Sequence, residues 1–267
     1  MKSLMSILII NLILSFSVSG QQDEKMIDEL VDISGIEKQT LSMRGVLSQQ
    51  IQARGPSEKL SEDQNNKLKS IMIGSLKENE ILKNTKNDLK SQLSKEEIEE
   101  VIKLHKSPLF IKTTKYEEEA SSPEGVKKLQ EFALEFSKTP PSDERIKLVQ
   151  KLDNSLKISK NNLLMVFQLT KGFAKAFDGR DFTEEESQQL LSILGTQMTQ
   201  VVYLQLFYTY KDLSDKELGK YVDMYLTRPS LKKVSDIVSN NLNKGLLEWG
   251  KDVGEKSKVL FSKTENK

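Results

Sequence analysis

The sequence predicts an all-α fold, a helical bundle built from two copies of a multi-helix unit, and three observations support this prediction. No segment of the 267 residues shows the period-two alternation of a half-buried strand. The chain contains only 13 Gly and 6 Pro, too few for a turn-rich β protein. The stretch Leu93–Leu109 returns in altered form as Leu213–Leu231, displaced by 213 − 93 = 120 residues. Whether the two copies share one core is left open by the sequence.

Residues 1–20 have the pattern of a cleaved signal peptide. Lys2 supplies a positive start, and the apolar segment Leu4–Val18 precedes the small residues Ser19 and Gly20. The apolar run is shorter than the ~20 residues that a spanning helix needs, so we expect no transmembrane segment in the mature chain. The expected localisation is therefore the periplasm or the extracellular space, after cleavage near Gly20.

Two helices are expected at the start of the mature chain. Met26–Ile51 carries apolar residues at spacings of three and four, which is typical of a helix, and Gly35 marks a break in it. Ser61 and Gln64 form a capping box that predicts the start of the second helix. We expect this second helix to run without interruption into the Lys- and Asn-rich stretch Lys83–Lys90, a solvated end.

The repeated stretch has the signals of a short helix followed by a turn. Ser94 with Glu97, and Ser214 with Glu217 in the second copy, form capping boxes. An apolar stripe at helical spacing follows each box, and a proline then starts the next helix, because Pro fits the first helical turn. Both copies therefore predict the same sequence of cap, buried stripe and turn.

The prolines of Thr139–Ser142 mark the predicted boundary between a first helical repeat, residues 21–139, and a second, residues 142–267. Ile146–Phe177 is expected to form one helix, and Pro229 to about Val259 another. A second matched pair supports the repeat, because the segment that begins at Leu60 resembles the one that begins at Phe182, and 182 − 60 = 122.

The helix opened by the capping box of Thr183 and Glu186 is the most apolar of the chain. Ser187–Tyr210 contains no charged residue, and its aliphatic residues cover much of the helix. A helix that is apolar on most sides is normally central in a large core, so we expect this position here. Its several Gln residues argue against a membrane span.

The first copy of the repeated stretch also resembles a known family. Leu93-Ser94, Glu97-Ile98, the run Leu104–Leu109 and Lys112 resemble the signature of the domain of unknown function 2059 family. The resemblance covers best the residues from Lys25 to about Glu119, and the second copy is similar more loosely. It implies an exported, all-helical bacterial protein, and the family offers no established catalytic residues to carry over.

Composition excludes several classes of partner and site. The chain has 40 Lys and Arg against 39 Asp and Glu, so it presents no basic surface for nucleic acid and no cationic bias toward anionic lipid. The chain has no Cys and one His, and no calcium-loop spacing, so we expect no disulfide, no metal site and no cofactor. The one His, His105, corresponds to Tyr225 in the second copy, which favours a packing position with a polar tip over a catalytic base.

The tyrosines suggest the one candidate site. Five of the 6 lie where the uncharged helix meets the second copy of the repeated stretch. Aromatic residues with polar tips can line a groove for a ligand or partner, although they also serve as ordinary core residues. The residues of this candidate groove are Tyr203, Phe207, Tyr210, Tyr221 and Tyr225.

The function expected from the sequence is that of an exported, non-enzymatic binding or envelope-associated module. No nucleophile, phosphate-loop or metal motif is recognisable, and the acidic runs, Glu117–Glu119 among them, are interpreted as solvated faces. The expected partner is an apolar ligand or another envelope protein. Two alternatives remain, a hydrolase that uses carboxylates or Tyr, and an amphipathic protein of the membrane surface.

Overall fold

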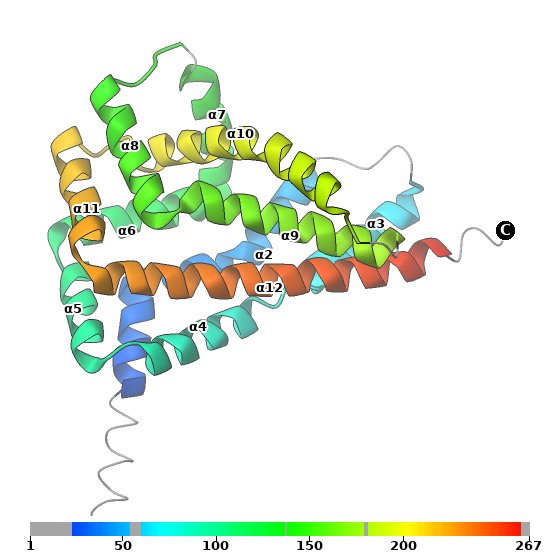
Figure 1. The fold of residues 1–267 in the computed structure, drawn as a ribbon, viewed down its shortest axis with the longest axis horizontal. Helices are drawn as coiled ribbons and strands as arrows, with labels where there is room; N and C mark the ends of the chain where they lie inside the picture. Colours follow the sequence, from blue (N-terminus) through cyan, green and yellow to red (C-terminus); the bar gives the residue numbers. More distant parts are fainter. Residues whose placement is uncertain (1–22, 54–59, 137, 179–180, 263–267) are drawn as a thin grey trace, which may run out of the picture.

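The all-α prediction is confirmed by a computed structural model, which describes residues 23–53, 60–136, 138–178 and 181–262 (Figure 1). Within these residues there is no strand. Residues 23–33 are helical and lead into the helices that precede residues Thr139–Ser142, which we call the linker. These are α2 (Ile36–Ala53), α3 (Glu62–Gly74), α4 (Glu78–Gln92), α5 (Lys95–His105), α6 (Pro108–Ser121) and α7 (Pro123–Phe136).

In the described part of the chain, five helices follow the linker, and the last of them is the longest. Helix α12 spans 34 residues and packs lengthwise against α9 on one side and α4 on the other. The five are α8 (Asp143–Leu156), α9 (Ile158–Asp178), α10 (Glu184–Thr209), α11 (Asp215–Thr227) and α12 (Pro229–Ser262). The predicted signal peptide lies outside the described residues and stays a prediction.

All four predicted capping boxes form. In each, the hydroxyl of the cap residue accepts a bond from a backbone N–H three residues on, while the side chain of that later residue accepts from the N–H of the cap. The pairs are Ser61 with Gln64, Ser94 with Glu97, Thr183 with Glu186, and Ser214 with Glu217. These bonds satisfy backbone donors that a helix start otherwise leaves free.

Two predicted helices are each broken in two. The helix that begins after Ser61 ends at Gly74, and α4 starts separately, so Lys83–Lys90 lies inside a helix and is not an end. The segment Ile146–Phe177 is interrupted at Lys157, which adopts a left-handed conformation with φ 53°. The Asp153 carboxylate accepts a hydrogen bond of 2.7 Å from the backbone N–H of Ser159 and so caps the start of α9. Such side-chain contacts are not visible in apolar periodicity.

One hydrophobic core contains residues from both sides of the linker. We call the residues before the linker the first half and those after it the second half. Leu30 and Phe110 come from the first half and Leu152 and Leu218 from the second, and all four side chains are fully buried in the same cluster. Helix α12 contributes to this cluster and also packs against α3, α4 and α5 of the first half. The two halves therefore bury their apolar faces against one another.

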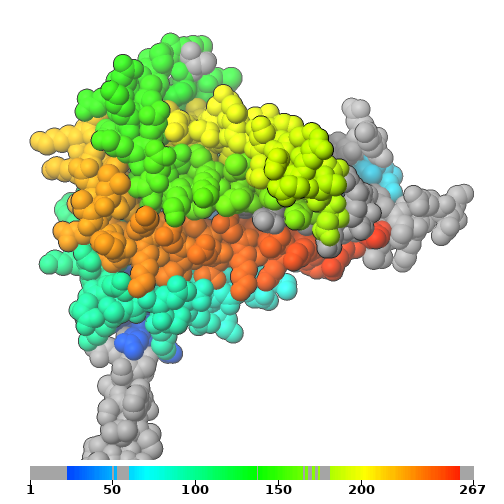
Figure 2. Space-filling model, viewed as in Figure 1, coloured from blue at the N-terminus to red at the C-terminus, as the bar shows by residue number. Residues whose placement is uncertain are grey.

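Helix α10 is not central in the core, and this prediction was wrong. Its buried residues, Val202, Leu206, Phe207 and Tyr208, all lie in its last eight positions. Upstream of them, Ile193 is 62% exposed and Val201 is 56% exposed, and Figure 2 shows the helix at the surface beside α9. The physical reason is that its outward side carries mainly Gln, Ser and Thr, which solvate without a charge.

Candidate functional site

A carboxyl group and three phenols form a hydrogen-bonded cluster between α6, α10 and α11. The Glu117 Oε1 atom accepts a hydrogen bond from the Tyr210 hydroxyl and another from the Tyr221 hydroxyl, each 2.6 Å long. The hydroxyls of Tyr221 and Tyr225 lie 3.3 Å apart. We call these four residues the Glu117 cluster.

The helices around the cluster are fixed by polar contacts as well as by the core. The Arg145 guanidinium donates to the backbone carbonyls of Tyr210 and Leu213, at 3.2 and 2.6 Å, and so caps the end of α10 that carries Tyr210. Lys112 on α6 donates to Glu217 on α11 at 2.9 Å. Tyr221 and Tyr225 are four residues apart on α11, so they share one face of that helix.

Aromatic packing connects the cluster to the histidine of the repeated stretch. The ring of Phe110 lies 4.7 Å from the ring of His105 in an edge-on arrangement and 5.1 Å from that of Tyr221. Phe110 is fully buried, and Tyr225 also packs against it. Helices α5, α6 and α11 therefore meet through these rings.

The carboxyl group of Glu117 lacks a cationic neighbour. No Lys or Arg among the described residues forms an ion pair with it, and its hydrogen-bond donors are the neutral phenols of Tyr210 and Tyr221. Burial raises the pKa of Glu117, the two phenol hydrogen bonds oppose this shift, and the nearby charge of Glu118 adds to it. Burial likewise raises the pKa of Tyr210 and Tyr221 well above the ordinary value, so both phenols stay neutral and can donate.

His105 is a buried, neutral residue. Its side chain is 7% exposed, and burial lowers its pKa to about 4. Its Nδ1 atom has no hydrogen-bond partner in the structure. A catalytic base needs a group that orients it and a route to solvent, whereas His105 is buried, its Nδ1 atom lacks a partner among the described residues, and its ring packs against Phe110.

A cavity of about 210 Å³ opens beside the Glu117 cluster. Glu117 and Tyr210 line it together with residues that carry amides or hydroxyls and residues with aliphatic side chains. The remaining lining residues are Gln39, Ala120, Ser121, Ile158, Asn162, Val202, Gln205, Leu206 and Thr209. A polar group that entered the cavity would therefore meet a carboxyl group, several amides and an aromatic ring.

The structure brings together three of the five residues of the sequence-based candidate groove. Tyr210, Tyr221 and Tyr225 belong to the Glu117 cluster. Phe207 packs instead against Phe136 on α7, with ring centres 5.1 Å apart, and Tyr203 is half-buried elsewhere along α10. The aromatic residues thus divide between the cluster and the ordinary core.

Glu117 is the site residue that sequence reasoning missed. The run Glu117–Glu119 was interpreted as a solvated face, but Glu117 points toward the phenols. Helical spacing gives the signal that could have found it, because Phe110, Thr114 and Glu117 stand at i, i+4 and i+7, and the first two are buried. One member of an acidic run therefore lies on the buried stripe of α6.

The arrangement offers one carboxyl group whose hydrogen-bond donors are phenols. Among the described residues no three His, Asp or Glu side chains converge as a metal site would require. Glu118, the acid next to Glu117, forms an ion pair with Lys38. Comparison of the chain with protein-family models, with curated proteins and with solved structures found no match in any of the three.

Proposed function

We propose that this chain is an exported, non-enzymatic binding protein and that the cavity beside Glu117 binds a small organic cation. One observation carries the proposal, namely the half-buried carboxyl group of Glu117, which accepts hydrogen bonds from two phenols, lacks a cationic partner within the described structure and lines a cavity. Buried carboxylates in proteins are normally paired with a cation or forced to take up a proton. An ammonium group in the cavity would supply the missing charge.

The cavity limits the size and chemistry of the ligand. Its volume of about 210 Å³ is below the ~300–1,000 Å³ of pockets for drug-sized molecules, so the ligand is a small amine or quaternary ammonium compound. The amide oxygens of Gln39, Asn162 and Gln205 can accept N–H bonds, and the ring of Tyr210 can face a cation. Aliphatic residues would contact a short carbon chain.

The non-enzymatic part of the proposal is supported by what surrounds Glu117. A paired-carboxylate hydrolase needs a second carboxyl group that faces the first across the substrate. The neighbours that contact Glu117 are phenols, and the acid beside it, Glu118, is paired with Lys38. These phenols hold the position of the carboxyl group, and both stay protonated because burial raises their pKa well above the ordinary value.

We also propose that the chain consists of two copies of one multi-helix unit, and the helix starts support this. In each copy a left-handed residue precedes the second helix, Gly35 with φ 73° and Lys157 with φ 53°, and 157 − 35 = 122. The later helices keep nearly the same displacement: 184 − 62 = 122 for α3 and α10, 215 − 95 = 120 for α5 and α11, and 229 − 108 = 121 for α6 and α12.

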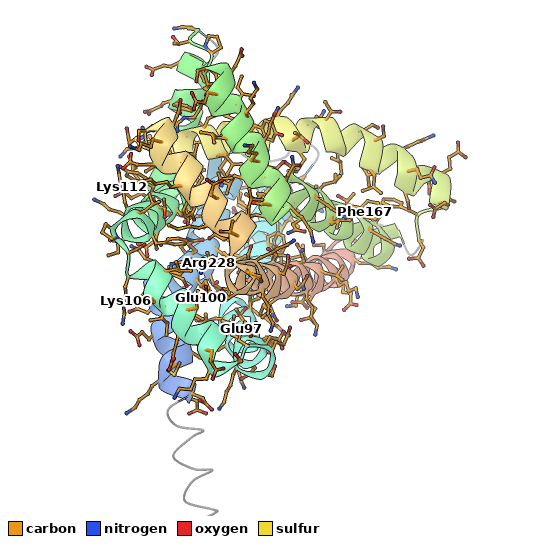
Figure 3. All side chains as sticks on the ribbon, turned by 60° about the vertical axis from the view of Figure 1, so that its left-hand side comes forward. Glu97, Glu100, Lys106, Lys112, Phe167 and Arg228 are labelled. Atoms are coloured by element: carbon orange, nitrogen blue, oxygen red, sulfur yellow. The ribbon has the colours of Figure 1, made fainter. Side chains whose placement is uncertain are left out.

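Reciprocal ion pairs give independent support for the two-copy proposal. Glu97 on α5 pairs with Lys233 on α12 at 2.9 Å, and Glu217 on α11 pairs with Lys112 on α6, also at 2.9 Å. Glu97 corresponds to Glu217 and Lys112 to Lys233, so each copy presents the same acid to the same base of the other. Reciprocal contacts of this kind characterise a two-fold interface. Figure 3 labels Glu97 and Lys112 on their helices.

Export and the family remain part of the proposal. Export is supported by the pattern of Lys2, the apolar segment Leu4–Val18 and the small residues before Gln21. The absence of Cys from the whole chain is compatible with a protein that folds in an oxidising compartment without disulfides. The resemblance of Leu93–Leu109 to the signature of the domain of unknown function 2059 family supports the same compartment.

The binding proposal is tested by calorimetric titration of the mature protein with butylammonium and tetramethylammonium chloride, and with uncharged 1-butanol as the control ligand. We expect the two cations to bind and Glu117→Gln to weaken the affinity at least tenfold, since this change removes the charge and keeps the shape. Glu119→Gln, an exposed acid outside the cavity lining, is the matched control and should leave affinity unchanged. Equal affinities for wild type and Glu117→Gln, or no heat with either cation, would overturn the proposal.

A further inference from the structure

Helix α10 carries an exposed stripe that is nearly the same when read from either end. The stripe consists of five exposed residues at a spacing of four, namely Gln189, Ile193, Gln197, Val201 and Gln205. Its order is amide, aliphatic, amide, aliphatic, amide, with Gln197 at the centre. Residues spaced by four form a continuous ridge along the surface of an α-helix. We call this ridge the α10 stripe.

A near-palindromic ridge is complementary to itself in the antiparallel direction. If two α10 helices cross at Gln197 about a two-fold axis, Ile193 of one copy meets Val201 of the other. The same axis places Gln189 against Gln205 of the second copy, and Gln197 against its own equivalent. An amide side chain both donates and accepts hydrogen bonds, so a pair of Gln residues can satisfy one another. Packing of such ridges from both helices is the commonest class of helix contact.

We propose that the α10 stripe is a self-association surface whose occupant is the α10 stripe of a second copy of this chain. The contact is isologous, since one patch on each copy makes both halves of it. Ser187–Tyr210 contains no charged residue, so two copies approach without repulsion between like charges. Depletion of charge distinguishes the centre of a protein interface better than overall apolarity does.

Comparison of α10 with α3 and α4, its counterparts in the proposed repeat, indicates that no helix covers the α10 stripe within the described structure. Helix α12 of the second half packs against both α3 and α4 of the first half. In the proposed repeat α6 corresponds to α12, but α6 has only 14 residues against 34 and gives way to α7 after Ser121. The buried residues of α10 lie at its C-terminal end, where Phe207 and Tyr208 pack against α7, and its middle turn faces Leu163 of α9 at Gly195. The stripe begins on the turns that precede this end.

The composition of the exposed face favours a protein partner over a lipid one. By length and composition, α10 is the one helix among the described residues that could cross a membrane. Its exposed face between positions 188 and 201 nevertheless consists mostly of amides and hydroxyls: Gln188, Gln189, Ser192, Thr196, Gln197 and Gln200. These groups would lack hydrogen-bond partners among lipid chains, whereas a second copy supplies them.

The size of the contact predicts a weak dimer. A single pair of crossing helices buries less than the ~1,600 Å² of a standard stable interface. We therefore expect a monomer–dimer equilibrium that depends on protein concentration, and not a permanent dimer. Sedimentation equilibrium over a concentration series of the mature protein measures its association constant.

A matched pair of double variants tests which surface is responsible. Ile193→Glu with Val201→Glu places charges on the stripe, and we expect association at least tenfold weaker than in wild type. Ile111→Glu with Leu226→Glu is the control, because these residues are 58% and 57% exposed, as the stripe residues are, but lie on α6 and α11. The control should associate like wild type. A wild-type chain that stays monomeric throughout, or a control that dissociates equally, would overturn the proposal.

Chemical cross-linking gives a second test that does not depend on the double variants. The chain has no Cys, so Gln197→Cys introduces a single thiol at the proposed two-fold axis. A short bismaleimide should link two copies of Gln197→Cys efficiently and two copies of Leu226→Cys poorly. Equal yields from the two variants contradict the proposal. Flotation of wild type with phosphatidylcholine vesicles, abolished by the stripe charges, would identify lipid as the occupant and overturn it as well.

Discussion

The pKa values of two titratable side chains, His105 and Glu117, are shifted in opposite directions for the same reason. Burial disfavours the charged form of each, so it lowers the pKa of His105 to about 4 and raises that of Glu117. His105 was correctly predicted as a packing residue, because its counterpart in the second copy is Tyr225. Glu117 was missed, because composition cannot tell which member of three consecutive Glu residues faces inward.

The perturbed histidine predicts a loss of stability in mild acid. The folded pKa of about 4 lies below the ordinary 6.5, so the unfolded chain binds more protons between these values and stability falls as the pH drops through them. From pH 7 to pH 5 this amounts to about 2 kcal/mol of unfolding free energy for His105. His105→Phe should remove that part of the pH dependence, as measured by urea unfolding at both values.

Tyr225→Phe is the control for this prediction. It lies at the corresponding position, packs against the same Phe110 ring and does not titrate in this range. It should keep the wild-type difference between pH 7 and pH 5. If His105→Phe also keeps the full difference, the assignment of the acid sensitivity to His105 is wrong.

At the scale of helices, the sequence signals that depend on local chemistry were the reliable ones. The capping boxes predicted the starts of α3, α5, α10 and α11, because a cap involves residues only three positions apart. The break at Lys157 was not foreseen, since a Lys there gives no sign of a left-handed conformation. The prediction that α10 lies at the centre of the core was also wrong. The lack of charged residues in α10 does not show which helices cover it, or where those helices end.

The reciprocal ion pairs allow the proposed two-fold relation to be measured. Double-mutant cycles with Glu97→Gln and Lys233→Met, and with Glu217→Gln and Lys112→Met, isolate the coupling in each pair. If the two contacts are equivalent, their coupling free energies should have the same sign and agree within about a factor of two. Urea unfolding of the single and double variants at low salt provides the values.

The intrahelical pair Lys115–Glu119 serves as a reference, because it lies within α6 and joins no two copies. Acid should abolish the coupling of the reciprocal pairs, since hydrogen bonding from Lys112 lowers the pKa of Glu217 to about 2 and the stabilisation is lost as the pH falls toward that value. A clear coupling in one reciprocal pair and none in the other would contradict equivalence.

At the scale of the whole molecule, the shared core makes the two halves one cooperative unit. Proteins whose domains have separate cores often unfold in steps, whereas a single core favours a single transition. Leu30 and Leu218 belong to one cluster although the linker separates them in sequence. The sequence predicted the helical class, which is confirmed, whereas the duplicated plan stays a proposal. The shared core could not be predicted, because contacts between distant helices leave no local pattern.

Cooperativity predicts that a cavity in the first half weakens the second half equally. Leu30→Ala removes a fully buried side chain and should lower the free energy of unfolding by about 2–5 kcal/mol. The fluorescence of Trp249 on α12, the single Trp of the chain, and the far-UV circular dichroism should give coincident urea transitions, both shifted to the same lower midpoint.

Leu134→Ala provides the comparison, because Leu134 is 72% exposed and its truncation should change the midpoint little. A dichroism curve in two steps, with the Trp249 transition left at its wild-type midpoint by Leu30→Ala, would show that the halves unfold independently.

The reciprocal contacts between the halves also bear on how two chains could exchange parts. Glu97 can meet Lys233 of its own chain or of another, and the same holds for Glu217 and Lys112, because the geometry of each contact does not depend on the connection through Thr139–Ser142. Such an arrangement is the starting point of domain swapping, in which identical elements change places between molecules. A short hinge favours such an exchange, so the length of the proline-containing linker Thr139–Ser142 decides whether these pairs form within one chain or between two.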